Sequence, residues 1–264
     1  MPKHSRLLVI PDVHQDINFL QYIFKNESLS DWDRIIFLGD FFDAKHPEFG
    51  NIASVDWICE FVIELKHTLK DRMVTLLGNH DLVFHVMSCY PERLTRQQKE
   101  MLLDIHGFTT WPAIEAAEYS FDPGFFKDVK LCHAEGGWLF SHAGVTLDTW
   151  ESFCGTGAKG INATEAFVSN INRWVDRSMP ENGDELPIPL FQAGKTRGGF
   201  LEKGGPLWLD WDEEFEDNLP LPQIVGHTVD STFRVNGRSY CLDARQSLYA
   251  RVYGPVVEPV IVPR

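Results

Sequence analysis

Short apolar runs that end at polar motifs are the feature of this chain that most restricts its fold. Five such runs occupy residues 7–10, 35–38, 74–77, 138–140 and 223–225. Runs of this length with little alternation of apolar and polar residues are typical of strands that are buried on both faces of a sheet. The sheets therefore need covering layers, which predicts an α/β fold of the α+β type.

A polar motif follows each apolar run directly. The motifs are PDVHQD at 11–16, GDFFD at 39–43, GNHD at 78–81, SHAG at 141–144 and GHT at 226–228. In layered α/β folds, ligands collect at the carboxyl ends of strands, where loops converge. We therefore expect the polar side chains of these motifs to meet at one site.

The motifs supply oxygen and nitrogen donors of the kind that bind divalent cations. The donors are Asp12, His14, Asp40, Asn79, His142 and His227. Carboxylate, amide and imidazole groups suit hard or borderline metals. A carboxylate such as Asp40 could bridge two cations roughly 3.5 to 4 Å apart, which together could hold a hydroxide and clamp a phosphoryl group.

His80, next to Asn79, is the candidate general acid that protonates a leaving alcohol. Asp43 lies three residues beyond Asp40 and could hold the imidazolium by a hydrogen bond and by its charge. We interpret Asp43 and His80 as a catalytic pair that is separate from the metal donors.

The residues between the runs predict the remaining elements. Apolar positions have helical spacing within 17–24 and 52–69, so the first half reads as strand, helix, strand, helix, strand. The stretch 239–254 alternates around turn-like residues 244–247, which predicts an antiparallel hairpin. These pieces together indicate a mixed sheet or two packed sheets, with helices outside.

Length and composition indicate one domain over residues 1–264. A chain of 264 residues with 44% hydrophobic residues can bury a sizeable core. Two segments, 85–130 and 151–221, do not fit the alternation of strands and helices. We expect them to be insertions, either of which could form a lid.

Charge and cysteine content narrow the expected partners. The 38 acidic and 24 basic residues leave a net charge of -14, which disfavours nucleic-acid binding.

The first apolar run is too short for a signal peptide, and no stretch of about 18 apolar residues could cross a membrane. The cysteines are odd in number without CxxC spacing, which favours reduced thiols in the cytoplasm. They are Cys59, Cys89, Cys132, Cys154 and Cys241.

The ordered motifs resemble those of the calcineurin-like metallophosphoesterase superfamily over residues 12–227. The resemblance implies a four-layer β-sandwich of mixed sheets flanked by helices. Many members end in GHxH, and Val229 stands where their second histidine would be. The GHT form is similar to the phosphoprotein phosphatase branch, which includes serine/threonine phosphatases and symmetrical diadenosine tetraphosphatases. The resemblance assigns Asp12, His14 and Asp40 to a first metal, and Asp40, Asn79, His142 and His227 to a second.

Two further segments are similar to members of this branch. SHAGVT and CLDARQSLY look more like the bacterial phosphatase and tetraphosphatase members than the eukaryotic enzymes. PLWLD at 206–210 is similar to a Leu-Trp-x-Asp segment of the phosphoprotein phosphatases. The resemblance therefore makes Asp210 and Asp243 candidate supporting residues.

The chain departs from the branch at two places. Pro11 and Gln15 stand where the first motif usually has glycines, so the local turn must differ. Ala44 and Lys45 stand where an arginine normally contacts phosphate, and a lysine is a point charge and not a bidentate fork. The candidate phosphate-binding residues are Lys45, Arg197 and Arg234.

The resemblance implies a two-metal phosphatase that hydrolyses phosphate monoesters, including phosphoserine or phosphothreonine protein, by direct attack of a metal-bound hydroxide. A symmetrical diadenosine tetraphosphatase, or another nucleotide phosphoanhydride hydrolase, is the alternative enzyme. A catalytically dead scaffold of the same fold is the alternative that is not an enzyme. We expect Mn first among the metals, and Fe, Zn, Co or Ni also accept these donors. The sequence leaves the oligomeric state open.

Overall fold

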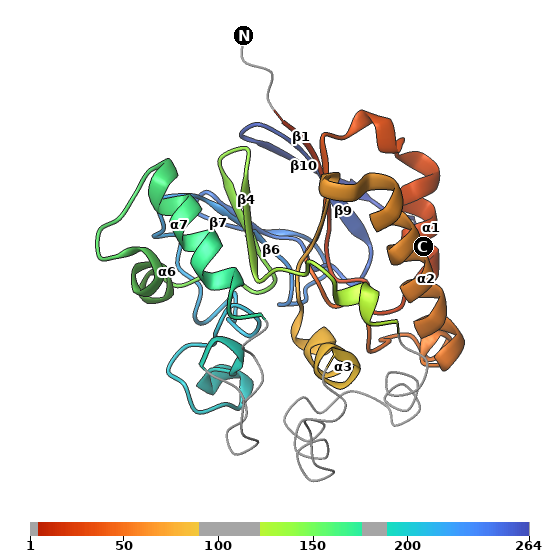
Figure 1. The fold of residues 1–264 in the computed structure, drawn as a ribbon, viewed down its shortest axis with the longest axis horizontal. Helices are drawn as coiled ribbons and strands as arrows, with labels where there is room; N and C mark the ends of the chain where they lie inside the picture. Colours follow the sequence, from red (N-terminus) through yellow and green to blue (C-terminus); the bar gives the residue numbers. More distant parts are fainter. Residues whose placement is uncertain (1–4, 90–121, 176–188, 264) are drawn as a thin grey trace.

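Two five-stranded mixed sheets form the centre of the molecule. A computed structural model describes residues 5–89, 122–175 and 189–263. The first sheet has the strand order β10-β9-β1-β2-β3 and the second has the order β4-β5-β6-β8-β7. Figure 1 shows the strands in the middle of the molecule, with helices at both sides. The strands are β1 (Arg6–Ile10), β2 (Arg34–Phe37), β3 (Met73–Thr75), β4 (Cys132–Glu135), β5 (Trp138–Ser141), β6 (Gln223–Val225), β7 (Arg234–Asn236), β8 (Ser239–Cys241), β9 (Leu248–Tyr253) and β10 (Val256–Ile261).

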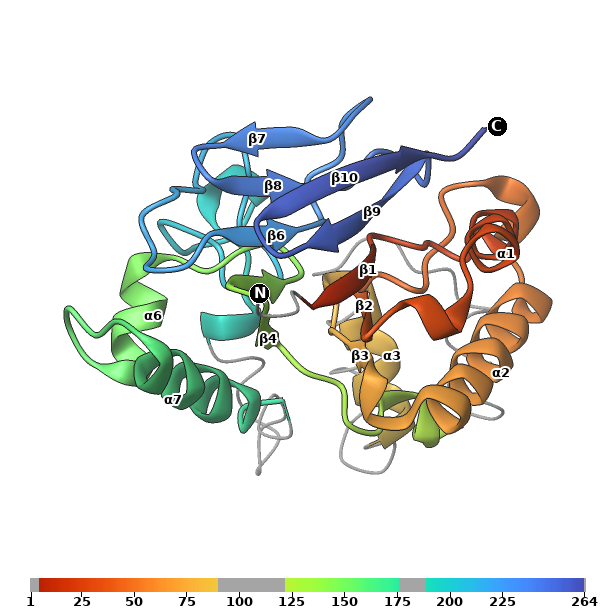
Figure 2. The same cartoon turned by 90° about the horizontal axis from the view of Figure 1, so that it is seen from above.

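Helices lie outside both sheets. They are α1 (Ile17–Asn26), α2 (Ile52–Leu69), α3 (Asn79–Cys89), α6 (Leu147–Cys154) and α7 (Ile161–Asn172). In Figure 2, α1 and α2 lie on the side of the first sheet, and α6 and α7 lie on the side of the second. The mixed sheets flanked by helices confirm the fold class that the sequence predicted.

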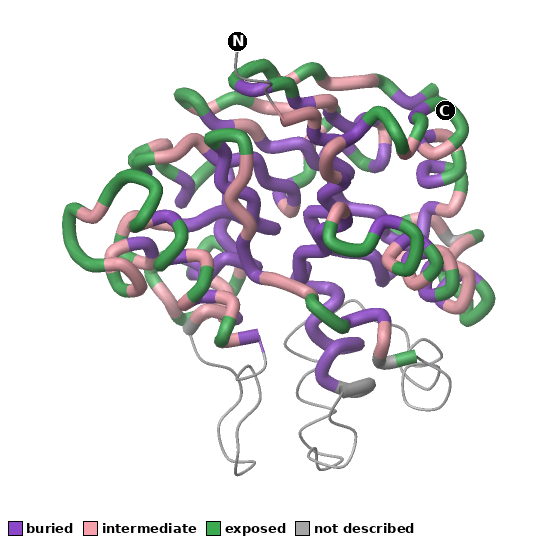
Figure 3. Tube along the Cα trace, turned by 45° about the horizontal axis from the view of Figure 1, so that its top comes forward, coloured by how far each residue is buried: buried purple, intermediate pink, exposed green. Residues whose placement is uncertain are grey.

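The strands contribute to different cores on their two faces. Leu7 and Val9 of β1 pack between the sheets in one cluster with Phe140 of β5. Leu8 and Ile10 belong to the cluster that includes the residues of α1 and α2. All five side chains are fully buried. Figure 3 shows that buried residues fill the centre of the molecule and that exposed residues lie around it. This two-sided burial explains why the apolar runs show so little alternation.

The direction of the strands brings the motifs together. In the first sheet β1 is parallel to β2 and β2 to β3, and in the second β5 is parallel to β6. Parallel neighbours have their carboxyl ends at the same edge of a sheet. The loops that follow β1, β2 and β3 therefore lie side by side, as do those that follow β5 and β6.

The predicted hairpin over 239–254 is wrong. Its two strands exist, but β8 pairs with β6 and β7 in the second sheet, whereas β9 pairs with β1 and β10 in the first. Arg245 and Gln246, both with φ of 55°, turn the chain from one sheet to the other. Alternation reports which side of a strand is buried, but it does not identify the neighbouring strand.

Two helices begin within the polar motifs. The carboxylate of Asp16 accepts a hydrogen bond of 2.9 Å from the Phe19 N–H and so caps α1. The helix α3 begins at Asn79 itself, directly after the loop from β3. The start of each helix therefore fixes the backbone of a motif at the edge of the first sheet.

The two predicted insertions are described only in part. The first contains the end of α3, and its residues 90–121 lie outside the described residues. The second contains the end of α6 and all of α7, and its residues 176–188 lie outside the described residues. The single domain and the lid therefore stay predictions.

None of the helices that the structure describes is long and apolar enough to cross a membrane. Cys59, Cys132, Cys154 and Cys241 are free thiols.

Candidate metal centre

Two groups of donor side chains overlap at Asp40. Asp12, His14 and Asp40 form one group, and Asp40, His142 and His227 form the other, with the ligand atoms of each group within 4.8 Å of one another. These donors come from four separate loops, and Asn79, whose Oδ1 lies 2.9 Å from a ring nitrogen of His142 and of His227, adds a fifth. We call the two groups, together with Asn79, the metal centre.

The tautomer of His14 leaves one ring nitrogen available as a ligand. Its Nδ1 lies 3.1 Å from the carbonyl oxygen of Phe42 and 3.0 Å from that of Asp43. Because carbonyl oxygens only accept hydrogen bonds, Nδ1 carries the proton and Nε2 keeps its lone pair. Nε2 lies 3.7 Å from Oδ2 of Asp40.

His142 is held in the same way on the other side of Asp40. Its Nδ1 donates to the Leu38 carbonyl oxygen at 2.9 Å, so its Nε2 is also unprotonated. Nε2 lies 3.5 Å from Oδ2 of Asp40 and 2.9 Å from Oδ1 of Asn79. Nδ1 of His227 lies 2.9 Å from the same Asn79 oxygen. A cation placed among these lone pairs would satisfy them together.

Asp12 joins the loops of the two sheets. Its carboxylate oxygens lie 3.0 and 3.2 Å from the backbone N–H of His227, which belongs to the loop after β6. Its own carbonyl oxygen accepts a hydrogen bond of 3.2 Å from Gln246 Nε2. The first and last motifs, 215 residues apart, are thus tied directly at the metal centre.

Several residues of the motifs have left-handed backbone conformations. Positive φ values occur at His14 (45°), Gln15 (59°), Asp40 (51°), Asp43 (67°) and His227 (68°). Such conformations cost about 1 kcal/mol or more for residues with a Cβ, and they tend to occur at functional sites. The surrounding sheets must hold these residues in place.

Three motif glycines are required by close packing against the donors. A Cβ at Gly39 would lie 2.6 Å from the Gly78 nitrogen, and a Cβ at Gly78 would lie 2.1 Å from Oδ1 of Asp40. A Cβ at Gly226 would lie 2.1 Å from Oδ2 of Asp12. The glycines therefore let two loops approach the donor carboxylates more closely than any other residue would allow.

Burial sets the protonation of the donors. It raises the pKa of Asp12 and of Asp40 well above the usual range, and the neighbouring carboxylates Asp243 and Asp12, respectively, raise them further. Burial lowers the pKa of His142 to about 3 and lowers that of His14 and His227 well below the usual range. Neutral imidazoles are the form that binds metal, and bound cations would supply the positive charge that the buried carboxylates need. The donor set therefore fits two divalent cations.

His80 and Asp43 lie in direct contact at the edge of the metal centre. Nδ1 of His80 is 2.6 Å from Oδ2 of Asp43, and Nε2 is 3.9 Å from Oδ2 of Asp40. Burial raises the pKa of Asp43 to about 7, an effect that the charge of Lys45 opposes. The imidazole thus has Asp43 on one nitrogen and the metal centre beside the other.

The sequence analysis gave no role to Asp81, the last residue of GNHD. Its Oδ1 accepts hydrogen bonds from the Phe41 and Phe42 N–H groups at 2.8 and 3.3 Å, and its Oδ2 accepts one from Gly78 at 3.1 Å. Asp81 is only 1% exposed. It therefore holds the loops of the second and third motifs together, and its position within the motif was the only signal for this role.

Gln15 stands where the family that this sequence resembles has a glycine. Its side chain bonds to the backbone directly after the second motif. Its Oε1 accepts a hydrogen bond of 3.2 Å from the Ala44 N–H, and its Nε2 donates to the Phe49 carbonyl and the Ser54 hydroxyl, both at 2.7 Å. The side chain thus holds the segment that carries Lys45. This departure from the family pattern has a structural role.

Lys45 and Arg197 contact different residues of the candidate site. Nζ of Lys45 is 3.5 Å from Nε2 of His80, and its charge is among the causes that lower the pKa of His14. The charge of Arg197 is among the causes that lower the pKa of His142 and of His227. Lys45 therefore lies beside His80, and Arg197 lies beside Thr228, the residue that follows the donor His227.

The remaining candidate residues have structural partners. Arg197 contacts Asp210 through Nε at 2.8 Å and donates to the Thr228 hydroxyl at 2.9 Å, so Asp210 orients it. Arg234 donates to Asp212 at 2.6 Å and to the carbonyl oxygen of Thr228. The buried carboxyl of Asp243 lies near enough to Asp12 to raise its pKa.

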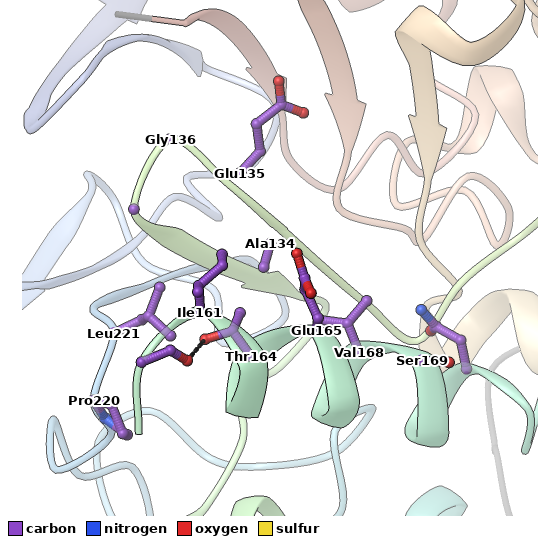
Figure 4. A pocket seen from close by; sticks show the side chains of 13 residues that line it. Ala134, Glu135, Gly136, Ile161, Thr164, Glu165, Val168, Ser169, Pro220 and Leu221 are labelled. Atoms are coloured by element: carbon purple, nitrogen blue, oxygen red, sulfur yellow. Dashed lines mark hydrogen bonds between the residues drawn. The ribbon is translucent and has the colours of Figure 1, made fainter. Parts of the chain in front are cut away.

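A separate cavity lies away from these donors. It has a volume of about 580 Å³ and lies between α7 and the turn that joins β4 and β5 (Figure 4). Ile161, Val168 and Leu221 give it an apolar lining. Its described lining residues include no member of the metal centre.

The chain matches a known family and shares its fold with solved phosphatases. The family model described as calcineurin-like phosphoesterase matches residues 5–231. A serine/threonine phosphatase from Saccharomyces cerevisiae is 14% identical, with a TM-score of 0.57; the match covers 100% of this chain and 82% of the yeast chain. A cold-active protein-tyrosine phosphatase of a Shewanella species is 15% identical, with a TM-score of 0.52; the match covers 98% of this chain and 82% of the Shewanella chain. No curated protein sequence matches the chain.

The close packing of Gly226 against Asp12 gives a testable prediction. Gly226→Ala should push the Asp12 carboxylate out of place and weaken Mn²⁺ binding by roughly tenfold to a hundredfold, as losses of supporting contacts at metal sites do. Isothermal titration with Mn²⁺ measures the affinity. Gly137→Ala, in the turn between β4 and β5, is the control for backbone strain away from the donors, because its φ of 89° disfavours alanine but a Cβ there meets nothing within 4 Å. Equal affinity in the Gly226 variant and the wild type would contradict the packing argument.

Proposed function

The chain belongs to the calcineurin-like phosphoesterase family and is a metal-dependent phosphoester hydrolase, and from this premise we propose that it hydrolyses phosphate monoesters with two divalent cations. The observation that supports this most strongly is the overlap of two donor groups at Asp40, with the Asp43 and His80 pair beside it. A phosphomonoesterase needs both parts, because phosphate must be bound and the leaving alcohol must receive a proton.

The six donors divide between the two cations. Asp12, His14 and Asp40 would hold the first cation, and Asp40, Asn79, His142 and His227 would hold the second. When bound, the cations would neutralise phosphoryl oxygens and lower the pKa of the attacking water. We expect Mn first, with Fe, Zn, Co or Ni as alternatives.

His80 is the proposed general acid. Asp43 contacts Nδ1 and stabilises the protonated ring, so Nε2 can present a proton toward the side of Asp40. That proton would pass to the ester oxygen as the bond to phosphorus breaks. Asp81 and Gln15 are proposed to position this loop without touching the substrate.

Lys45 and Arg197 are the proposed contacts to the phosphate oxygens. Lys45 lies beside His80, and Asp210 and Thr228 hold the Arg197 fork in one orientation. Arg234 is given a supporting role, because Asp212 and the Thr228 carbonyl already use its donors. Asp243 is proposed to support Asp12 and the turn beside it.

The enzyme assignment predicts the behaviour of Asp40→Asn. Removing the shared charge should weaken both cation sites and lower kcat/KM for p-nitrophenyl phosphate by about a thousandfold or more, because each metal supplies several kcal/mol of charge stabilisation. Assays in buffer supplemented with Mn²⁺ measure the loss. Unchanged turnover would refute the two-metal site and would leave the dead scaffold as the better account.

The proton-delivery role predicts a selective defect in His80→Asn. The variant should bind Mn²⁺ as the wild type does, yet lose roughly a hundredfold to ten-thousandfold in kcat toward an alkyl phosphate. The loss toward p-nitrophenyl phosphate should be smaller, because nitrophenolate leaves without a proton. His67→Asn, on the exposed side of α2, is the control. A loss of the same size for both esters would contradict general acid catalysis by His80.

A further inference from the structure

Phe200 is the most exposed large apolar side chain among the described residues. It is 97% exposed, compared with 76% for Ile261 on β10. Single exposed apolar residues are ordinary on protein surfaces. Phe200 differs from them through the loop that carries it and through the position of that loop.

The loop of residues 194–204 is closed on itself by backbone hydrogen bonds. The Lys195 N–H donates to the Leu201 carbonyl at 2.8 Å, and the Gly199 N–H donates to the Gly194 carbonyl at 2.9 Å. Arg197 donates to the same Gly194 carbonyl at 3.0 Å. Phe200 therefore lies in a defined turn, held from both sides.

Close packing further restricts this loop. A Cβ at Gly199 would lie 2.0 Å from the Ala193 carbonyl oxygen, and a Cβ at Gly194 would lie 2.3 Å from a carboxylate oxygen of Glu214. Gly198 has a φ of 80°, which favours glycine. Because the backbone has little room to rearrange, burying Phe200 within its own loop is unfavourable. Its exposure is a fixed property of the turn.

The same loop reaches the metal centre through Arg197. Arg197 bonds to Asp210 and to the hydroxyl of Thr228, which follows the donor His227. Phe200 is three positions after Arg197 in the sequence, which is at most roughly 10 Å of extended chain. Val229, the residue after Thr228, is 50% exposed. Exposed apolar residues therefore follow both the proposed phosphate-binding Arg197 and its partner Thr228 closely in the chain.

The charged residues near Phe200 favour a polypeptide substrate over a polyphosphate substrate. Lys195 is paired with Glu202, and Lys203 is paired with Glu216 at 2.5 Å. These pairs cancel the positive charge that a chain of additional phosphates would need. An apolar side chain carries no such requirement, and contact with an exposed phenyl ring would bury area on both partners.

We propose that Phe200 docks an apolar or aromatic side chain that flanks the phosphorylated residue of a polypeptide substrate. This inference rests on the proposed phosphomonoesterase function and adds the part of the substrate that the enzyme recognises beyond the phosphate. Phe200 acts in binding, and Arg197 on the same loop holds the phosphate. Loop 194–204 thus sets the distance between the two contacts.

The test compares matched phosphoserine peptides that carry either Phe or Gly beside the phosphoserine. In the wild type, kcat/KM should be higher for the Phe peptide. In Phe200→Ala, the ratio of kcat/KM for the Phe peptide to that for the Gly peptide should fall about tenfold, as expected for losing a contact of this size. Phe200→Leu should keep part of the preference, and Ile261→Ala, an exposed apolar control, should keep the wild-type ratio.

The outcomes separate this inference from the proposed function. An unchanged ratio in Phe200→Ala, with p-nitrophenyl phosphate and both peptides still hydrolysed, would overturn the docking role alone. A selective loss of turnover of nucleoside phosphates in the variant would overturn it in favour of base stacking. Wild-type activity restricted to dinucleoside polyphosphates would refute the docking role and the phosphomonoesterase together.

Discussion

The Asp40 carboxylate is the group on which the rest of this site depends. Both donor groups include it, His80 donates to its Oδ1 through the backbone N–H at 3.0 Å, and its Oδ2 lies within 4 Å of the ring nitrogens of three histidines. Asp40 has a φ of 51°. The preceding Gly39 packs closely against Gly78, which in turn packs against the Asp40 carboxylate. A shift of this one residue would disturb metal binding and proton delivery at once.

The two-sheet core explains how such a residue is held in place. The apolar strands β1, β2 and β5 are buried on both faces and end where the motifs begin. The strained loops cost energy, and the buried strands hold them in place. Asp81 and Asp12 then connect loops that come from different strands. The site is therefore stabilised by hydrogen bonds to its own backbone before any cation binds.

The sequence predicted the strands and the meeting of their loops for a simple reason. A strand that is buried on both faces needs consecutive apolar residues, which can be seen in the sequence. The chemistry of a metal site limits the residue types at the strand ends. The connection between β8 and β9 could not be predicted, because alternation does not say which sheet a strand joins. The roles of Asp81 and Gln15 were missed for a related reason. Each depends on a hydrogen bond to a loop that is distant in sequence.

Two cations that share Asp40 are the central requirement of the proposed site, and spectroscopy of the Mn²⁺-loaded protein tests it. The protein should bind two Mn²⁺ ions per chain and give the electron paramagnetic resonance spectrum of an exchange-coupled pair, since cations bridged in such sites lie roughly 3.5 to 4 Å apart. Asp40→Asn should abolish the coupled spectrum. A single ion per chain, or a wild-type spectrum of isolated Mn²⁺ at full occupancy, would contradict the account.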